Sequence, residues 1–185
     1  MGRAKQLEVV DGAPMVVRAV QIALASDATN VMVVTGAYAE KVAAILQPLM
    51  AEATRQLRLV HNDAWATGQA SSVRVAVQAL PASCQAALFL PTDQPFVPVA
   101  LLNRLIATWR TGARLVAPTV NGQTRGAPAI FDRSLWSDLL ALEGDTGARP
   151  LLQRYQAELI TIAADSAWLR DIDTPEDLPT TEPQA

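Results

Sequence analysis

The sequence predicts a three-layer α/β domain in which helices cover both faces of a mostly parallel sheet. Apolar strand-like runs alternate with stretches of helical period, these runs are apolar on both faces, and half of the 185 residues are hydrophobic. Ligands of such a sheet bind at the carboxyl ends of its strands. We expect one domain over residues 1–178 and a disordered tail over residues 179–185.

The strand candidates are short apolar runs bounded by turn residues. In chain order they are Val31–Thr35, Leu57–His61, Ala86–Thr92, Arg114–Pro118, Ala127–Phe131 and Glu158–Ala163. Two of the intervening helices show an apolar stripe, formed by Val42, Ile45, Leu46 and Leu49 in one and by Leu101, Leu102, Leu105, Ile106 and Trp109 in the other.

The start of the chain departs from this pattern. A doubly wound fold normally opens with a strand that lies centrally in the sheet. This sequence opens instead with the basic, loop-like stretch "MGRAKQL". We therefore expect the sheet to lack its first strand.

Composition excludes several classes of function. A formal net charge of -3 argues against a dedicated nucleic-acid binder. Cys84 is the single cysteine, so neither a disulfide framework nor a cysteine-rich metal site is possible. The apolar stretch Pro14–Ala25 is too short to span a membrane and carries Arg18, and no signal peptide is recognisable. We expect a cytoplasmic protein without a membrane partner.

A metal site is predicted from two acidic stretches. Asp93, in "LPTDQPFVP", follows a strand candidate and so lies at the carboxyl edge of the sheet, although a turn aspartate is an alternative interpretation. In "LRDIDTPEDL", an extended backbone would place Asp171 and Asp173 on the same side, where they repel each other unless a cation lies between them. Magnesium usually takes one or two protein carboxylates together with phosphate oxygens, and Asp93 and Asp173 would supply that pair.

Helix capping accounts for three residues of the second acidic stretch without any bound ligand. Thr174 is a predicted helix cap, with Pro175 at the first helical position and Asp177 at the capping-box position.

Basic and glycine-rich stretches accompany the acids. Arg3 and Lys5 are candidates to meet phosphate oxygens, although a solvated chain end is an equally natural interpretation. The stretch "GQASSVRVAV" from Gly68 offers exposed amides at a helix start, or simply a serine-capped helix. Arg149, at the start of a predicted helix, could clamp a second phosphate.

Seven stretches resemble, in order, those of the molybdenum cofactor cytidylyltransferases. They are "MGRAKQL", "VVTGAYAEKV", "NDAWATGQASSVRVAV", "LFLPTDQPFV", "RGAPAIFD", "LEGDTGARPLL" and "DIDTPEDL", and they cover the chain from Met1 to about Leu178. These enzymes belong to the MobA-like nucleoside triphosphate transferases, which have a Rossmann-like fold.

The resemblance implies transfer of CMP from CTP to a molybdopterin phosphate, with release of pyrophosphate. The product is the cytosine dinucleotide cofactor, and the implied client is a molybdoenzyme of the xanthine dehydrogenase type. The implied cofactor is Mg²⁺, with Asp93 and Asp173 at the positions of the family's metal ligands. Lys5 matches the signature lysine at the triphosphate.

Other matching positions imply the remaining contacts. Gly68 and Ser72 match the stretch near the nucleobase, and Arg3 would join Lys5 at the nucleotide. The stretches that would line the acceptor side contain Gly126, Pro128, Asp145 and Arg149. A molybdopterin phosphate is already anionic near neutral pH, its second pKa being roughly 6, so the reaction requires no general base.

The sequence departs from the family pattern at its start. The family begins with a strand and "LAAGxSxRMGxxK", and this sequence joins that pattern at its methionine. Either the start codon lies further upstream or the chain is a true truncation. In the second case Arg3 and Lys5 lack their scaffold.

Two further interpretations stay open. One is a transferase with another nucleotide or acceptor, such as GTP. A guanylyltransferase of the same superfamily typically has a "GGxDK" style loop, whereas the "GRAK" of this sequence fits the cytidylyl branch better. The other is a non-catalytic relative that binds a pterin or a nucleotide and transfers nothing.

Overall fold

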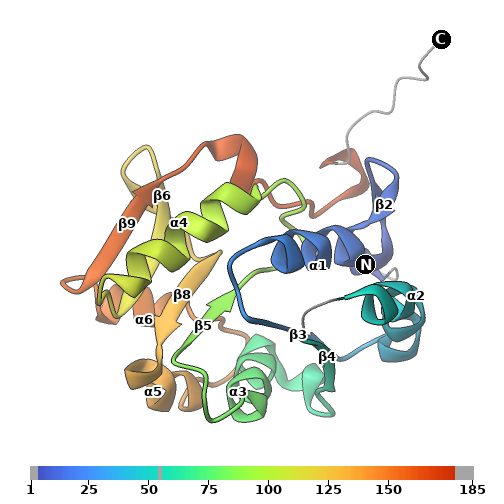
Figure 1. Cartoon of the computed structure of the whole chain (residues 1–185), viewed down its shortest axis with the longest axis horizontal. Helices are drawn as coiled ribbons and strands as arrows, with labels where there is room; N and C mark the ends of the chain where they lie inside the picture. The colour runs from blue at the N-terminus through green and yellow to red at the C-terminus, as the bar shows by residue number, and fades with distance from the viewer. Residues whose placement is uncertain (1–3, 54–55, 178–185) are drawn as a thin grey trace.

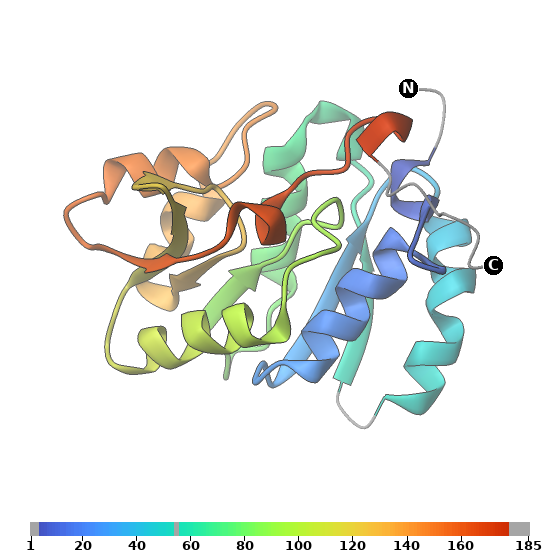
Figure 2. The same cartoon turned by 90° about the horizontal axis from the view of Figure 1, so that it is seen from above.

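The structure is a computed structural model that describes residues 4–53 and 56–177. Strands form the middle layer, with α1, α2 and α4 on one face and α3, α5 and α6 on the other (Figures 1 and 2). The helices are α1 (Met15–Ala25), α2 (Ala39–Glu52), α3 (Gln69–Ala79), α4 (Val99–Arg110), α5 (Trp136–Leu140) and α6 (Arg149–Arg154). The strands are β1 (Val9–Val10), β2 (Ala13–Pro14), β3 (Asn30–Thr35), β4 (Gln56–His61), β5 (Ala86–Phe89), β6 (Leu115–Val120), β7 (Gln123–Thr124), β8 (Ala129–Asp132) and β9 (Leu159–Ala163).

The predicted α/β class is confirmed, and all six predicted strands are present as β3, β4, β5, β6, β8 and β9. The predicted strand Ala86–Thr92 is shorter, since β5 ends at Phe89. Pro91 lies two residues after the end of β5, and proline has no amide hydrogen for a strand ladder. The predicted helix after Thr174 is a single 3-10 turn, Pro175–Asp177, within the described residues.

Within the described residues the strands form three separate sheets, and one of them is the short antiparallel pair of β1 and β2. β3 pairs with β4 in parallel, from Asn30 opposite Gln56 to Thr35 opposite His61. In the larger sheet, β8 lies antiparallel between β5 and β6, and β9 runs parallel to β6. β5, β6 and β9 therefore share one direction, and β8 alone of these four runs against them. We call β5, β8, β6 and β9 the closed half and β3 with β4 the open half.

The closed half is packed on both faces, as its alternating side chains show. Leu115 and Ala117 of β6 contact a core beneath α3, α5 and α6, whereas Val116 contacts a second core beneath α4. Ala129 and Phe131 of β8 belong to the first core. This period of two, apolar on both faces, is what the sequence pattern predicted for a sheet covered on both sides.

Candidate active site

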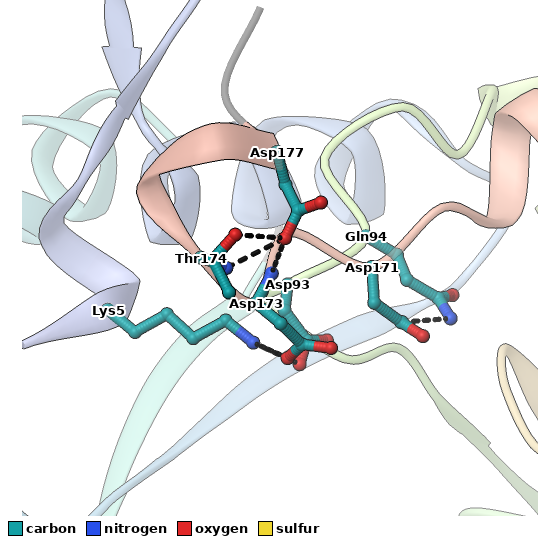
Figure 3. Close-up of polar contacts among 7 residues, drawn as sticks. All are labelled: Lys5, Asp93, Gln94, Asp171, Asp173, Thr174 and Asp177. Atoms are coloured by element: carbon teal, nitrogen blue, oxygen red, sulfur yellow. Dashed lines mark hydrogen bonds and ion pairs between the residues drawn. The ribbon is translucent and has the colours of Figure 1, made fainter. Parts of the chain in front are cut away.

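The loop after β5 and the segment after β9 meet at one edge of the sheet. The amide of Ile172 donates to the backbone oxygen of Asp93 at 2.9 Å. Next to it, Nε2 of Gln94 donates to Oδ1 of Asp171, also at 2.9 Å (Figure 3). One backbone bond and one side-chain bond thus fix two segments that lie about 80 residues apart in the chain.

Asp93 and Asp173 both form an ion pair with the ammonium group of Lys5. Nζ of Lys5 lies 3.0 Å from Oδ2 of Asp93 and 2.6 Å from Oδ1 of Asp173 (Figure 3). Lys5 begins the 3-10 turn Lys5–Leu7, whose place beside α1 directs the lysine toward the two acids. The structure therefore brings together the three residues on which the predicted metal and triphosphate site depends.

The electrostatics of Lys5 reflect this pairing. Partial burial lowers the pKa of its ammonium group, but hydrogen bonds to Asp173 and Asp93 and the charges of both acids outweigh burial. The pKa of Lys5 consequently stands above its ordinary value, and the lysine stays charged at neutral pH.

The two carboxylates fit a divalent cation by their chemistry. Both direct an oxygen at a single positive atom, and they come from separate segments that leave the other side open to a ligand. Within residues 4–53 and 56–177, no group of three or more His, Cys, Asp or Glu side chains could hold a metal. An ion here would have two protein carboxylates, which is the usual number where phosphate oxygens complete the shell.

A tight turn holds Asp173 in place. Oδ2 of Asp177 accepts from the amides of Asp173 and Thr174, at 3.0 and 2.8 Å, and from the Thr174 hydroxyl at 2.9 Å. These bonds, first of all that from the Thr174 amide, hold the pKa of Asp177 below its ordinary value. The predicted capping box accounts for this turn. The turn also orients Asp173, a candidate metal ligand.

The predicted nucleobase stretch lies at the start of α3. Gly68 has a φ of +114°, and a Cβ there would clash with the backbone oxygen of Gly144, so only glycine fits. The amide of Gln69 donates to Oδ1 of Asp145 at 3.1 Å. Asp145 therefore caps α3, and it draws the predicted acceptor stretch against the predicted nucleobase stretch.

Sequence reasoning missed Asn62, which organises this region. Asn62 is fully buried, and its Nδ2 donates to the hydroxyls of Ser71 and Ser72 at 2.8 and 3.0 Å. Its Oδ1 accepts from the amide of Ala64. The sequence signal was a polar residue directly after a predicted strand. Its hydrogen-bond partners Ser71 and Ser72 could not be identified from the sequence.

A cavity of about 1,090 Å³ connects these stretches. Several of the predicted site residues line it, namely Ser72, Asp93, Gly126, Asp145, Arg149 and Asp173. Lys5, Gly68 and Pro128 lie beside it and are not among its lining residues, and Arg3 is outside the described residues. Arg149 begins α6 as predicted and packs against Gly126, while Pro128 follows a cis peptide bond.

Two further residues were not predicted as part of the site. Gln94, which is 7% exposed, orients Asp171, and its Oε1 is buried without a hydrogen-bond partner among the described residues. Asp177 was predicted only as a cap. None of the described helices is long and apolar enough to cross a membrane.

Comparison with solved structures supports the same fold. Rv0371c of Mycobacterium tuberculosis H37Rv, crystallised with manganese, is 23% identical, with a TM-score of 0.77 over 95% of this chain and 90% of that one. A nucleotidyl transferase from Methanothermobacter thermautotroptrophicus is 24% identical, with a TM-score of 0.77 over 94% and 81%. CMP:2-keto-3-deoxy-manno-octonic acid synthetase complexed with CTP is 15% identical, with a TM-score of 0.64 over 93% and 87%.

No match was found among curated protein sequences. Residues 1–159, however, match the family described as the MobA-like NTP transferase domain. This match covers well over half of the 185 residues. The chain belongs to the MobA-like NTP transferase family and is a nucleotidyltransferase.

Proposed function

We propose that this protein transfers CMP from CTP to the phosphate of molybdopterin, giving molybdopterin cytosine dinucleotide and pyrophosphate. The observation that carries the proposal is the meeting of Lys5, Asp93 and Asp173 at the sheet edge, beside the cavity. A phosphate oxygen of the acceptor would attack the α-phosphorus of CTP. The bond from that phosphorus to the bridging oxygen would break, and pyrophosphate would leave with that oxygen.

The proposal assigns Mg²⁺ as cofactor, held by Asp93 and Asp173. When bound there, the ion would neutralise phosphate charge as a Lewis acid. The manganese in the Rv0371c crystal and the CTP in the synthetase structure support a divalent ion and a cytidine nucleotide for this fold.

The protein's own groups supply the remaining electrostatics. Lys5 carries its charge at neutral pH and would contact the triphosphate. Arg3, two residues earlier in the sequence, is assigned to the same nucleotide. Gly68 and Ser72 would face the nucleobase. Arg149, which lines the same cavity as Asp93, would hold the acceptor phosphate. Fixed charges of this kind act mainly by positioning two polyanions and stabilising developing charge.

The remaining acceptor contacts are assigned to Gly126, Pro128 and Asp145, around Arg149. Gly126 lies against the side chain of Arg149, and Asp145 fixes the loop against α3. The acceptor phosphate is anionic near neutral pH, so no histidine or other base has to remove a proton. The product would serve a molybdoenzyme of the xanthine dehydrogenase type.

The experiment measures pyrophosphate release from CTP with molybdopterin and Mg²⁺. Asp93→Asn should reduce kcat/KM by about 10²–10³-fold or more, because it removes a charge that acts on the reacting phosphates. Asp27→Asn is the matched control, since Asp27 lines the opposite end of the same cavity and should leave turnover unchanged.

Undiminished turnover in Asp93→Asn would refute the assigned role. Competition between CTP and GTP separates the nucleotides, and preferential use of GTP would contradict the cytidylyl assignment. Binding of CTP without any pyrophosphate release would favour a non-catalytic relative.

A further inference from the structure

A hydrogen-bonded pair, Gln94 and Asp171, lies beside the candidate metal ligands and has no role in the proposed transfer. Nε2 of Gln94 donates to Oδ1 of Asp171 at 2.9 Å (Figure 3). Gln94 directly follows Asp93, and Asp171 precedes Asp173 by two residues. A bond between this pair therefore acts on the segments that carry both candidate ligands.

The pair belongs to a set of contacts that join residues 93–96 to residues 170–172. The contacts follow in opposite order along the two segments, namely the Arg170 guanidinium over the Phe96 ring at 5.0 Å, Gln94 with Asp171, and the amide of Ile172 with the backbone oxygen of Asp93. Only the last of these joins backbone to backbone. The bond from Gln94 is the polar side-chain contact nearest to it.

The middle residue of the acidic segment is anchored in a small core. Ile172 is buried and packs with Val10 and Met15, whereas Asp171 and Asp173 on either side of it are exposed. The two acids have different partners, since Asp171 accepts from the Gln94 amide and Asp173 pairs with Lys5 (Figure 3). A neutral donor thus holds one carboxylate and leaves the other to a cation.

Packing does not explain why residue 94 is a glutamine. Gln94 is 7% exposed, and its Oε1 is buried without a hydrogen-bond partner among the described residues. A buried polar atom without a partner costs stability, and a leucine of similar size would leave no such atom. The bond that the amide donates to Asp171 is therefore the contribution that a leucine could not make.

We propose that Gln94 is a positioning residue of the metal site, because it holds Asp171 and thereby fixes Asp173 relative to Asp93. The backbone bond from Ile172 is a single point about which the acidic segment could rotate, and the bond from Gln94 adds a second point. Residues that orient metal ligands in this way typically change metal affinity by about 10–100-fold. The inference rests on the proposed metal site at Asp93 and Asp173.

The experiment measures Mn²⁺ binding to the full chain in the presence of CTP by electron paramagnetic resonance. Gln94→Leu and Asp171→Ala should each bind Mn²⁺ about tenfold more weakly than the parent. The double variant should bind no more weakly than either single variant, because both substitutions remove the same bond. Asp171 is exposed, so Asp171→Ala reports on that bond even if Gln94→Leu does not fold.

A conservative variant separates positioning from direct coordination. Asp171→Asn keeps a side-chain oxygen that can accept from Nε2 of Gln94, so its Mn²⁺ affinity should stay within about threefold of the parent. A direct metal ligand would lose as much affinity as Asp173→Asn does.

A matched control applies the same substitution at the other end of β5. Gln85 lines the same cavity, is exposed, and donates from Nε2 to the backbone oxygen of Ser83. Gln85→Leu should leave Mn²⁺ affinity within about twofold of the parent, since surface positions away from a site have small effects.

Three results would overturn the positioning role. They are full Mn²⁺ binding in a folded Gln94→Leu or Asp171→Ala variant, effects of these two that multiply in the double variant, and a loss in Asp171→Asn as large as in Asp173→Asn. If Asp93→Asn and Asp173→Asn weaken binding and Gln94→Leu does not, the positioning role alone fails. Full binding in all of these variants would overturn the metal site and, with it, this inference.

Discussion

The closed and open halves of the sheet are built from similar apolar strands but are stabilised in different ways. In the closed half, β6 is sandwiched between two cores, and Leu115 and Phe131 are fully buried. In the open half, β3 and β4 share a smaller core with α1 and α2, and one side of β3 borders the cavity. Burial of a strand thus depends on its neighbours in the sheet as much as on its own sequence.

The candidate site lies where the two halves meet. Asp93 follows β5 and Asp173 follows β9, both strands of the closed half, whereas Ser72 lies on α3, which follows β4. Lys5 precedes both halves and reaches the two acids. The closed half therefore carries the acids, and strands of both halves contribute to the cavity wall.

The largest expected difference is between two leucines. Leu115→Ala in the fully buried position of β6 should lower the free energy of unfolding by about 3 kcal/mol, since it leaves a cavity. Leu59→Ala in β4, where the side chain is half-buried, should cost roughly 1 kcal/mol. Urea unfolding of both variants provides the measurement, and equal losses would contradict the distinction between the halves.

The buried amide of Asn62 should make a large contribution to the free energy of unfolding, although the open half has the smaller apolar core. Asn62→Ala removes the buried amide that joins the end of β4 to Ser71 and Ser72, and we expect a loss of about 2 kcal/mol. Asn30→Ala serves as control, because the Asn30 amide donates at the surface to Thr29, and its effect should stay within about 0.5 kcal/mol. Similar effects in the two variants would show that the Asn62 network contributes little.

Protonation of Asp132 at low pH should lower the free energy of unfolding, because this residue of β8 is stabilised in its charged form. Burial raises the pKa of this carboxyl, but bonds from Ser134 and Trp109 and the charge of Arg114 outweigh burial and hold it below its ordinary value. The stability that this provides is present above the unfolded-state pKa and is lost as the pH falls through the folded-state value.

Asp132→Asn should therefore show a smaller loss of stability than the parent protein between pH 5 and pH 2. Urea unfolding across this range measures it. Trp109→Phe, which removes one of the donors to Asp132, should retain part of the acid sensitivity. An identical pH profile for the parent and Asp132→Asn would contradict the assignment.

The strands of the fold were predictable because each is a short apolar run between turn residues, as with Val31–Thr35 and Leu57–His61. What the sequence could not give was the pairing. The reversed direction of β8 depends on contacts with β5 and β6 that lie far along the chain. The end of β5 was overestimated because Leu90 continues the apolar run although the strand ladder stops at Phe89.

The site was predictable where chemistry and strand ends coincide. Asp93 and Asp173 were identified because acids that follow apolar strands reach the same sheet edge. Asn62, Gln94 and the orienting role of Asp177 were missed, because each acts through partners that only the fold brings near. Asp145 was assigned to a ligand, whereas the structure also gives it a backbone partner in Gln69.

The most direct test of the account is whether Asp93 and Asp173 hold one divalent ion. Binding of Mn²⁺ in the presence of CTP is measured by electron paramagnetic resonance for the parent, Asp93→Asn, Asp173→Asn and the double variant. We predict that each single variant binds at least tenfold more weakly and that the double variant loses less than the product of the two effects, as expected for ligands of a shared ion. Full binding in either single variant, or effects that multiply as at independent sites, would contradict the shared metal site.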